Sequence, residues 1–367
     1  MIGIMFPLKR NNIYLIFNMM RLQNLIYFTS AFLMILFSGC SGSGAKSPVT
    51  KLEVAAPVES TPMVLNTQAL LLMDDLKKTG DYVNSKDFPS LIKPSIVFES
   101  LRKNVRVIDI RKKEAFSSGH IQGAVNIQFE NLPSYFVNDI KPFESDKIII
   151  VCGDGQKSAY TTSLLRLMGY GNAYAMRSGM SGWNKKSAED GWLKGISGKY
   201  QDKLEITDNA KPAPGNLPDL KTNFSSGMDV RDSRFKQVFA AGISDVLISA
   251  DEVFANPGKY FIINYERKDK YDSGHIPGAI RYKPDGTLGI LSEMLTIPAD
   301  KQVVVYCGSG HNSAFVTAYL RLLGYDAKTL RYGNQSFMYD RMVSEEATLS
   351  WQPFSIADVG DFPVVRN

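Results

Sequence analysis

Short runs rich in Val and Ile alternate along the chain with longer stretches of mixed polarity. Four such runs predict buried strands: residues 105–110, 147–151, 260–264 and 302–306. Helices are expected after the second and fourth runs, over residues 158–168 and 313–323. Apolar strands that alternate with helices are typical of a parallel sheet covered on both faces. The pattern therefore predicts an α/β fold.

This pattern occurs twice. The string Ser-Gly-His-Ile-x-Gly-Ala ends at Ala124 and again at Ala279. His120 pairs with His275, and Cys152 pairs with Cys307, each pair being separated by the same 155 positions. A constant offset without gaps indicates two copies of one domain.

The repeat sets the expected domain boundaries. Domain 1 is placed at residues 68–196 and opens with a helix over 68–78 that is expected to pack on it. Domain 2 is placed at residues 229–355. Residues 197–228, which contain several Pro, Asn and Asp residues, are interpreted as the linker.

The N-terminus has the features of a targeting segment. An uncharged, mostly apolar stretch ends in Leu36-Phe-Ser-Gly-Cys40, with small residues just before the cysteine. This resembles a bacterial lipoprotein signal, which implies that residues 1–39 are removed and Cys40 is lipidated. Residues 40–67, rich in Ser, Gly, Pro and Ala, then form a flexible tether. The expected location is the cell envelope, on the outer membrane facing the periplasm or the cell surface; a transmembrane anchor is the alternative.

Composition narrows the class of protein. The 367 residues are 44% hydrophobic and 22% charged, which describes a globular chain. The net charge of +5 is spread along the sequence, without a dense basic run interleaved with aromatics. Nucleic acid is therefore not an expected partner. A mildly positive surface suits small anionic substrates.

Each repeat has its cysteine at a strand-to-helix turn that contains two glycines. Such a turn aims successive N–H groups at an anion, and the following helix adds positive potential. A thiolate there is expected to have a lowered pKa and to act as a nucleophile. A disulfide between Cys152 and Cys307 is the alternative. The substrate-binding residues expected around the two sulfurs are Gly153, Asp154, Gly155, Gln156, Lys157 and Ser158, and Gly308, Ser309, Gly310, His311, Asn312 and Ser313.

The chain resembles a tandem rhodanese. The resemblance rests on Asp109-x-Arg111, on the Gly-His-Ile-x-Gly-Ala elements, on the two cysteine loops and on the closing segment 177–183, echoed at 331–337. It implies two rhodanese-like domains, each a parallel sheet flanked by helices on both faces. It also implies a persulfide on cysteine, a small anionic sulfur donor and a thiol- or cyanide-type acceptor, with no metal and no organic cofactor.

Other residues qualify the resemblance. In the family, the histidine at 120 and 275 orders a turn, so a structural role is expected for both. Ser158 and Ser313 stand where related phosphatases carry an arginine, which favours sulfur over phosphate. Domain 2 departs from the pattern with Asn264, Glu266 and Phe337.

Three functions stay open at this level. The first is a sulfurtransferase that uses thiosulfate or another sulfane (or selenium) donor. The second is a non-catalytic rhodanese-fold lipoprotein that docks an envelope protein partner in a redox or electron-transfer complex. The third is a carrier that passes persulfide sulfur to a partner protein.

Overall fold

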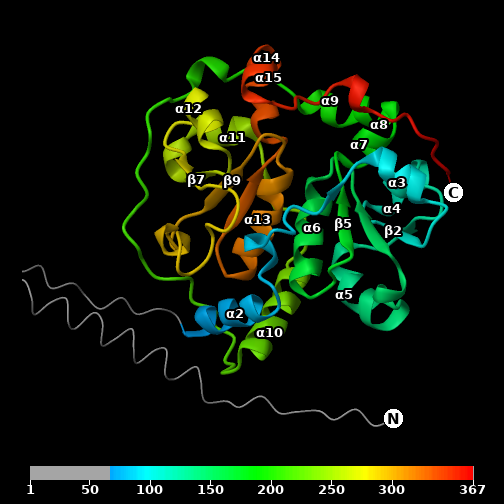
Figure 1. Cartoon of the computed structure of the whole chain (residues 1–367), viewed down its shortest axis with the longest axis horizontal. Coiled ribbons are helices and arrows are strands. Elements are labelled where there is room, and N and C mark those ends of the chain that lie inside the picture. Colours follow the sequence, from blue (N-terminus) through cyan, green and yellow to red (C-terminus); the bar gives the residue numbers. More distant parts are fainter. Residues whose placement is uncertain (1–66, 367) are drawn as a thin grey trace, which may run out of the picture. The chain divides into compact units, whose positions relative to one another are not determined.

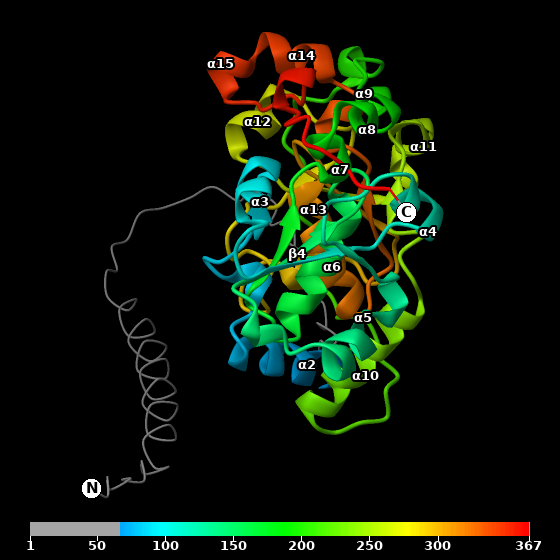
Figure 2. The same ribbon diagram turned by 90° about the vertical axis from the view of Figure 1, so that its right-hand side faces the viewer.

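The computed structural model describes residues 67–366 (Figure 1). It contains two five-stranded sheets in which every pairing is parallel, with strand orders β1-β5-β4-β2-β3 and β6-β10-β9-β7-β8. Helices flank both sheets (Figures 1 and 2). The predicted α/β class and the pair of matching domains are confirmed.

The first sheet and its helices come from the first repeat. Its strands are β1 (Leu91–Ile92), β2 (Val105–Asp109), β3 (Val125–Asn126), β4 (Lys147–Val151) and β5 (Ala173–Met176). Its helices are α2 (Thr67–Lys78), α3 (Pro94–Ser100), α4 (Lys113–Ser118), α5 (Leu132–Ser134), α6 (Gln156–Leu167), α7 (Gly179–Trp183), α8 (Lys185–Asp190) and α9 (Trp192–Gly195).

The second repeat follows the same order. Its strands are β6 (Leu247–Ile248), β7 (Phe261–Asn264), β8 (Ile280–Arg281), β9 (Val303–Tyr306) and β10 (Ala327–Leu330). Its helices are α10 (Gly227–Ala240), α11 (Ala250–Ala255), α12 (Lys268–Ser273), α13 (His311–Leu322), α14 (Tyr339–Ser344) and α15 (Glu346–Leu349).

The central strands explain the Val/Ile runs. β4 pairs with β2 and β5, and β9 pairs with β7 and β10, so both edges of each central strand are hydrogen-bonded. Ile148–Val151 and Val303–Tyr306 are completely buried. A strand covered on both faces has no position for a polar side chain, which is why these segments lack the alternation of a half-exposed strand.

α6 and α13 join the two domains. Ser163 Oγ on α6 donates a buried hydrogen bond to the carbonyl of Phe315 on α13 (2.9 Å). Phe315 also packs edge-on against Phe88, at 5.7 Å between ring centroids. Side chains of both domains thus form one continuous core. Each helix therefore buries one face on its own sheet and another on its counterpart, instead of exposing a polar side.

Three terminal or connecting segments cross between the repeats. α2 was expected to pack on domain 1, but it lies beside α10, where Arg231 forms an ion pair with Asp75 (2.8 Å; Figures 1 and 2). Residues 356–366 return to domain 1, where Phe362 stacks on Phe98 at 4.4 Å. The linker buries Leu217 and Leu220 in the shared core.

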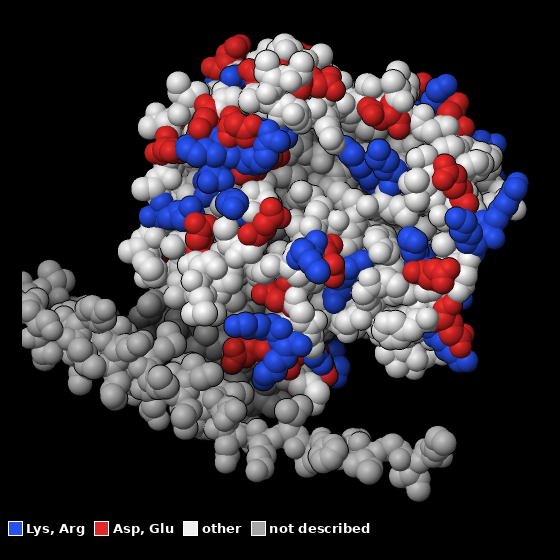
Figure 3. Space-filling view, viewed as in Figure 1, with Lys and Arg blue, Asp and Glu red and all other residues white. Residues whose placement is uncertain are grey.

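The targeting predictions fall elsewhere in the chain. The signal segment 1–39, Cys40 and the tether, apart from its last residue, lie outside the described residues. Between residues 67 and 366 no helix is long and apolar enough to cross a membrane. On the face drawn in Figure 3, Lys and Arg side chains lie in separate groups with Asp and Glu between them.

Candidate active sites

Both cysteines lie at the carboxyl ends of the central strands. Cys152 follows β4 and Cys307 follows β9, and both thiols are free and buried. α6 and α13 begin two residues earlier than predicted, because Gly155 (φ 84°) and Gly310 (φ 77°) adopt left-handed conformations just before the first helical residue. Only glycine takes up that conformation without strain. The tight turn aims the N-terminus of each helix at its sulfur.

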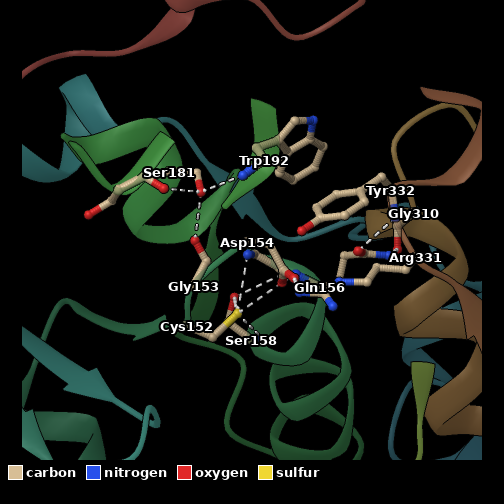
Figure 4. Close-up of polar contacts among 12 residues, drawn as sticks. Cys152, Gly153, Asp154, Gln156, Ser158, Ser181, Trp192, Gly310, Arg331 and Tyr332 are labelled. Carbon is tan, nitrogen blue, oxygen red and sulfur yellow. Dashed lines mark hydrogen bonds and ion pairs between the residues drawn. The ribbon is translucent and has the colours of Figure 1, made fainter. Parts of the chain in front are cut away.

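Amides of the first loop converge on the Cys152 sulfur. Sγ accepts hydrogen bonds from the amides of Gly155 (3.1 Å) and Ser158 (3.2 Å), and the Ser158 hydroxyl lies 3.6 Å away (Figure 4). The Gln156 amide instead donates to Asp154 Oδ1 (3.1 Å). The predicted ring of amides therefore exists, but a carboxylate of the protein already occupies part of it.

The predicted lowering of the Cys152 pKa is wrong. Burial raises this pKa to about 11, and the charge of Asp154 adds to the increase, because its Oδ1 lies 3.7 Å from Sγ. Hydrogen bonds from Ser158 oppose the increase only in part. The prediction counted the helix and the amides that favour a thiolate, but it left out the cost of removing the thiolate from water.

The second loop has fewer donors to its sulfur. The amide of Ser313 lies 3.4 Å from Cys307 Sγ, and its hydroxyl lies 3.7 Å away. The amide of Gly308 donates to the carboxylate of Glu266. Burial raises the pKa of Cys307 and Glu266 raises it further, again against the prediction; burial also raises the pKa of Glu266 itself.

Arg111 and Glu266 occupy equivalent positions but have different partners. Arg111 Nε and Nη2 both donate to Asp109 Oδ2 (3.0 and 2.7 Å). Nη2 also donates to the carbonyl of Gly119 (2.8 Å). Arg111 holds the turn after β2. Glu266 turns toward the cysteine loop instead, with Lys270 at 3.9 Å.

Each sulfur faces a cavity. That at Cys152 measures about 600 Å³ and includes Lys157, as the sequence predicted, together with Arg111 and Arg331. That at Cys307 measures about 410 Å³ and includes Asn312, also predicted. In both cases the opposite domain supplies part of the wall. The residues from domain 2 at Cys152 are Ile243, Ser244, Leu247, Ile248, Ser249 and Arg331, and those from domain 1 at Cys307 are Pro89, Leu91 and Arg177.

Gln156, expected at the substrate site, instead turns its side chain into the interface between the domains. Its side-chain amide donates to the carbonyls of Gly310 (3.3 Å) and Leu330 (3.2 Å) and accepts from the amide of Tyr332 (2.9 Å; Figure 4). It is completely buried. All its polar atoms are therefore committed to the protein.

His311 is the counterpart of Gln156 in domain 2. Its Nε2 accepts from the amide of Ser178 (3.0 Å), Nδ1 lies 2.9 Å from the Ser309 hydroxyl, and the ring stacks on Trp192. Burial, followed by the charge of Arg177, lowers the pKa of His311 to about 3. The expected titratable neighbour of Cys307 is therefore neutral near pH 7.

The backbone of Gly153 in the first cysteine loop contacts the closing segment of the domain 1 motif. The carbonyl of Gly153 accepts hydrogen bonds from the amide (3.0 Å) and hydroxyl (3.1 Å) of Ser181, in the closing segment of the domain 1 motif.

His120 and His275 each bond the carbonyl four residues earlier (3.0 and 2.9 Å) and stack on an aromatic ring. Neither histidine lines a cysteine cavity, in agreement with the structural role expected for both.

Arg177 and Arg331 were not recognised as site residues. Each follows the last strand of its sheet and opens the closing segment of its motif. Their equivalent positions in the two repeats were the available signal. The sequence alone does not predict that the two repeats pack against each other. In the structure, each arginine lines the cysteine cavity of the opposite domain.

These features define a class: a two-domain α/β protein with a cysteine in a helix-opening turn at the centre of each parallel sheet. The family model of the rhodanese-like domain matches residues 98–186 and 249–339. The thiosulfate sulfurtransferase GlpE of Shewanella oneidensis is 32% identical over 87 residues, which are 23% of this chain and 82% of that protein. The chain belongs to the rhodanese-like family and contains two copies of its domain.

Other similarities cover varying shares of the proteins compared. The tRNA uridine(34) hydroxylase of Rickettsia typhi is 26% identical over 140 residues, 37% of this chain and 53% of that protein. This chain therefore spans about half of that relative. A thiosulfate sulfurtransferase structure from Pseudomonas aeruginosa gives a TM-score of 0.26 and 16% identity, covering 72% of this chain and 46% of that one. Family membership and similarity to GlpE support a sulfurtransferase-like class.

Proposed function

We propose that this protein moves a sulfane sulfur from a donor such as thiosulfate, through a cysteine persulfide, to a thiophilic acceptor. The carrying observation is the Cys152 loop, where two backbone amides point at Sγ within a cavity that also contains Lys157. Fixed N–H groups stabilise negative charge on a sulfur at low reorganisation cost. Thiosulfate is a small dianion, and a cationic residue in the cavity suits it.

The steps balance without an added oxidant. Cys152 first loses its proton to water in the cavity, and the amides of Gly155 and Ser158 then stabilise the thiolate. The thiolate attacks the outer sulfur of thiosulfate, the donor S–S bond breaks, and sulfite leaves with the electron pair. The acceptor, a thiolate or cyanide, then attacks the terminal sulfur of the persulfide and releases the cysteine thiolate. Cys307 follows the same scheme, with the amide of Ser313 3.4 Å from its sulfur.

The test is thiocyanate formation from thiosulfate and cyanide. We expect turnover by the wild type and none by the Cys152→Ser/Cys307→Ser double variant. The single variants show which domain works, and intact mass reveals a bound sulfur atom on the donor-treated protein. Absence of both turnover and added sulfur with thiosulfate and other common donors would contradict the proposal.

The raised pKa values of Cys152 and Cys307 favour a second candidate, a non-catalytic rhodanese-fold subunit that docks an envelope protein. A protonated thiol is a poor nucleophile. If the double cysteine variant retains full cellular function, this second candidate replaces the first.

The proposed location is a lipid anchor at Cys40 in the cell envelope. It is supported by the small residues and apolar stretch before Cys40. Metabolic labelling with a fatty acid tests it: the wild type should carry the label and Cys40→Ser should not.

A further inference from the structure

Each domain contributes one arginine to the cysteine cavity of the opposite domain. Arg331, directly after β10 of domain 2, lines the cavity of Cys152 in domain 1. Arg177, directly after β5 of domain 1, lines the cavity of Cys307 in domain 2. The two arginines begin equivalent segments of the repeat. The exchange is therefore reciprocal.

The backbone around each arginine is fixed by the opposite cysteine loop. Gln156, four positions after Cys152, bonds the residue before Arg331, through the Leu330 carbonyl, and the residue after it, through the Tyr332 amide (3.2 and 2.9 Å). His311, the equivalent of Gln156, accepts from the amide of Ser178, next to Arg177 (3.0 Å). Gln156 and His311 are buried. Hydrogen bonds across the interface thus fix the backbone on which each arginine is carried relative to the opposite cysteine loop.

Both arginines retain charge and donors for a ligand. Arg331 has its side chain 52% exposed, and its Nη2 lies 3.5 Å from Asp154 Oδ2, a long ion pair. Arg177 donates to the neutral Gln352 side chain (2.7 Å), and within residues 67–366 it has no ion pair. A guanidinium has five N–H donors in a planar fork that matches an oxyanion. Most of these donors remain available to a bound anion.

We infer that Arg331 and Arg177 select anionic sulfur donors across the domain interface, each for the cysteine of the opposite domain. This inference rests on the proposed function for its substrate class, which is a sulfane sulfur bonded to a sulfonate-like group. The guanidinium binds the oxygens of that group, and the outer sulfur then lies toward the cysteine. The assignment predicts a crossed pattern: each arginine governs the charge preference of the distant repeat's thiol.

Two thiol reagents of opposite charge test the crossing. Sulfonatoethyl methanethiosulfonate is an anion and its trimethylammonioethyl analogue is a cation; both form a mixed disulfide with a thiolate and release methanesulfinate. Rates at Cys152 and Cys307 are read separately by peptide mass spectrometry on the full-length chain at pH 8. Arg331→Gln should lower the anion-to-cation rate ratio at Cys152 about tenfold and leave the ratio at Cys307 unchanged. Arg177→Gln should do the reverse.

Matched variants separate charge from folding. Arg331→Lys and Arg177→Lys keep the charge and should keep most of the wild-type ratio. Arg102→Gln, an exposed arginine outside both cavities, should change neither ratio. A melting curve for each variant confirms that the two domains are folded.

Three outcomes would overturn the inference: an effect of each arginine on the cysteine of its own domain, unchanged ratios in both glutamine variants, or wild-type cysteines that neither reagent reaches. The reagents need no sulfur transfer, so the result is independent of turnover. A crossed pattern in a protein that forms no thiocyanate would retain the inference and reject the proposed reaction. Turnover without a crossed pattern would retain the proposed reaction and reject the inference about the arginines.

Discussion

The two domains share a backbone but place different charges around sulfur. In domain 1 the carboxylate comes from the cysteine loop itself, as Asp154, while Arg111 is locked onto Asp109. In domain 2 the loop has the uncharged Ser309 in that place, and Glu266 supplies the carboxylate from the end of β7. Burial and one carboxylate raise the pKa of each cysteine. The two repeats thus reach the same electrostatic result from different sequence positions.

The difference shows which part of the motif supports the fold and which part tunes the sulfur. The glycine at positive φ and the following helix are the same in both loops. The residue two positions after the second strand of each repeat differs: Arg111 after β2 bonds Asp109 and the Gly119 carbonyl, whereas Glu266 after β7 approaches the cysteine loop.

The largest expected effect is on stability, from Arg111. Arg111→Met should lower the free energy of unfolding by about 3–5 kcal/mol, because it leaves the buried Asp109 carboxylate without its cation. Glu266→Met, at the equivalent position, should cost much less, since it removes a buried carboxylate whose own pKa is raised. Urea unfolding measures both. Equal losses would contradict the separation of a bracing residue from a tuning residue.

A smaller effect is expected from Asp154. Asp154→Asn should speed modification of Cys152 by neutral iodoacetamide about tenfold at pH 8. Its carboxylate raises the thiol pKa, so removing the charge lowers that pKa and increases the thiolate fraction. The asparagine oxygen can still accept from the Gln156 amide. Cys307 in the same molecule is the control, and its rate should stay constant.

The wild-type pH profile checks the same argument. With a pKa near 11, the Cys152 rate should keep rising through pH 9 and show no plateau near neutrality. A plateau below pH 8 would mean that the loop amides outweigh burial, and the explanation given for Asp154 would then be wrong.

Glu266 should have a weaker effect on Cys307. Glu266→Gln should speed alkylation of Cys307 about threefold, with Cys152 as the internal control. The effect is smaller because the Lys270 ammonium, 3.9 Å from the Glu266 carboxylate, offsets part of its charge. The glutamine oxygen preserves an acceptor for the Gly308 amide. A slower Cys307 in this variant would assign Glu266 to proton removal instead of charge repulsion.

Much of this architecture follows from the sequence because its causes are local. The Val/Ile runs, the glycines after each cysteine and the Ser249 hydroxyl that caps α11 all act within a few residues. The strand predicted at 147–151 coincides with β4. The family also followed from local motifs, through their order and spacing.

The features that the sequence did not predict depend on contacts between segments that are distant in the chain. Nothing near Gln156 indicates that it binds the backbone beside Arg331, and nothing near Arg177 indicates that it reaches the cavity of Cys307. The direction of the cysteine pKa shifts was missed for the same reason, because burial comes from packing that no loop sequence displays.

The smallest expected effect separates His311 from a catalytic histidine. Because the pKa of His311 is lowered to about 3, its ring stays neutral throughout pH 5–9 and holds the interface by accepting from the Ser178 amide. The alkylation rate of Cys307 should therefore show no inflection near pH 6.5, the ordinary pKa of a histidine. His311→Gln installs the residue that domain 1 has at this position, and it should leave the shape of the profile unchanged. An inflection near pH 6.5 that disappears in His311→Gln would show that His311 titrates beside Cys307, and the two loops would then differ in chemistry as well as in the origin of their carboxylates.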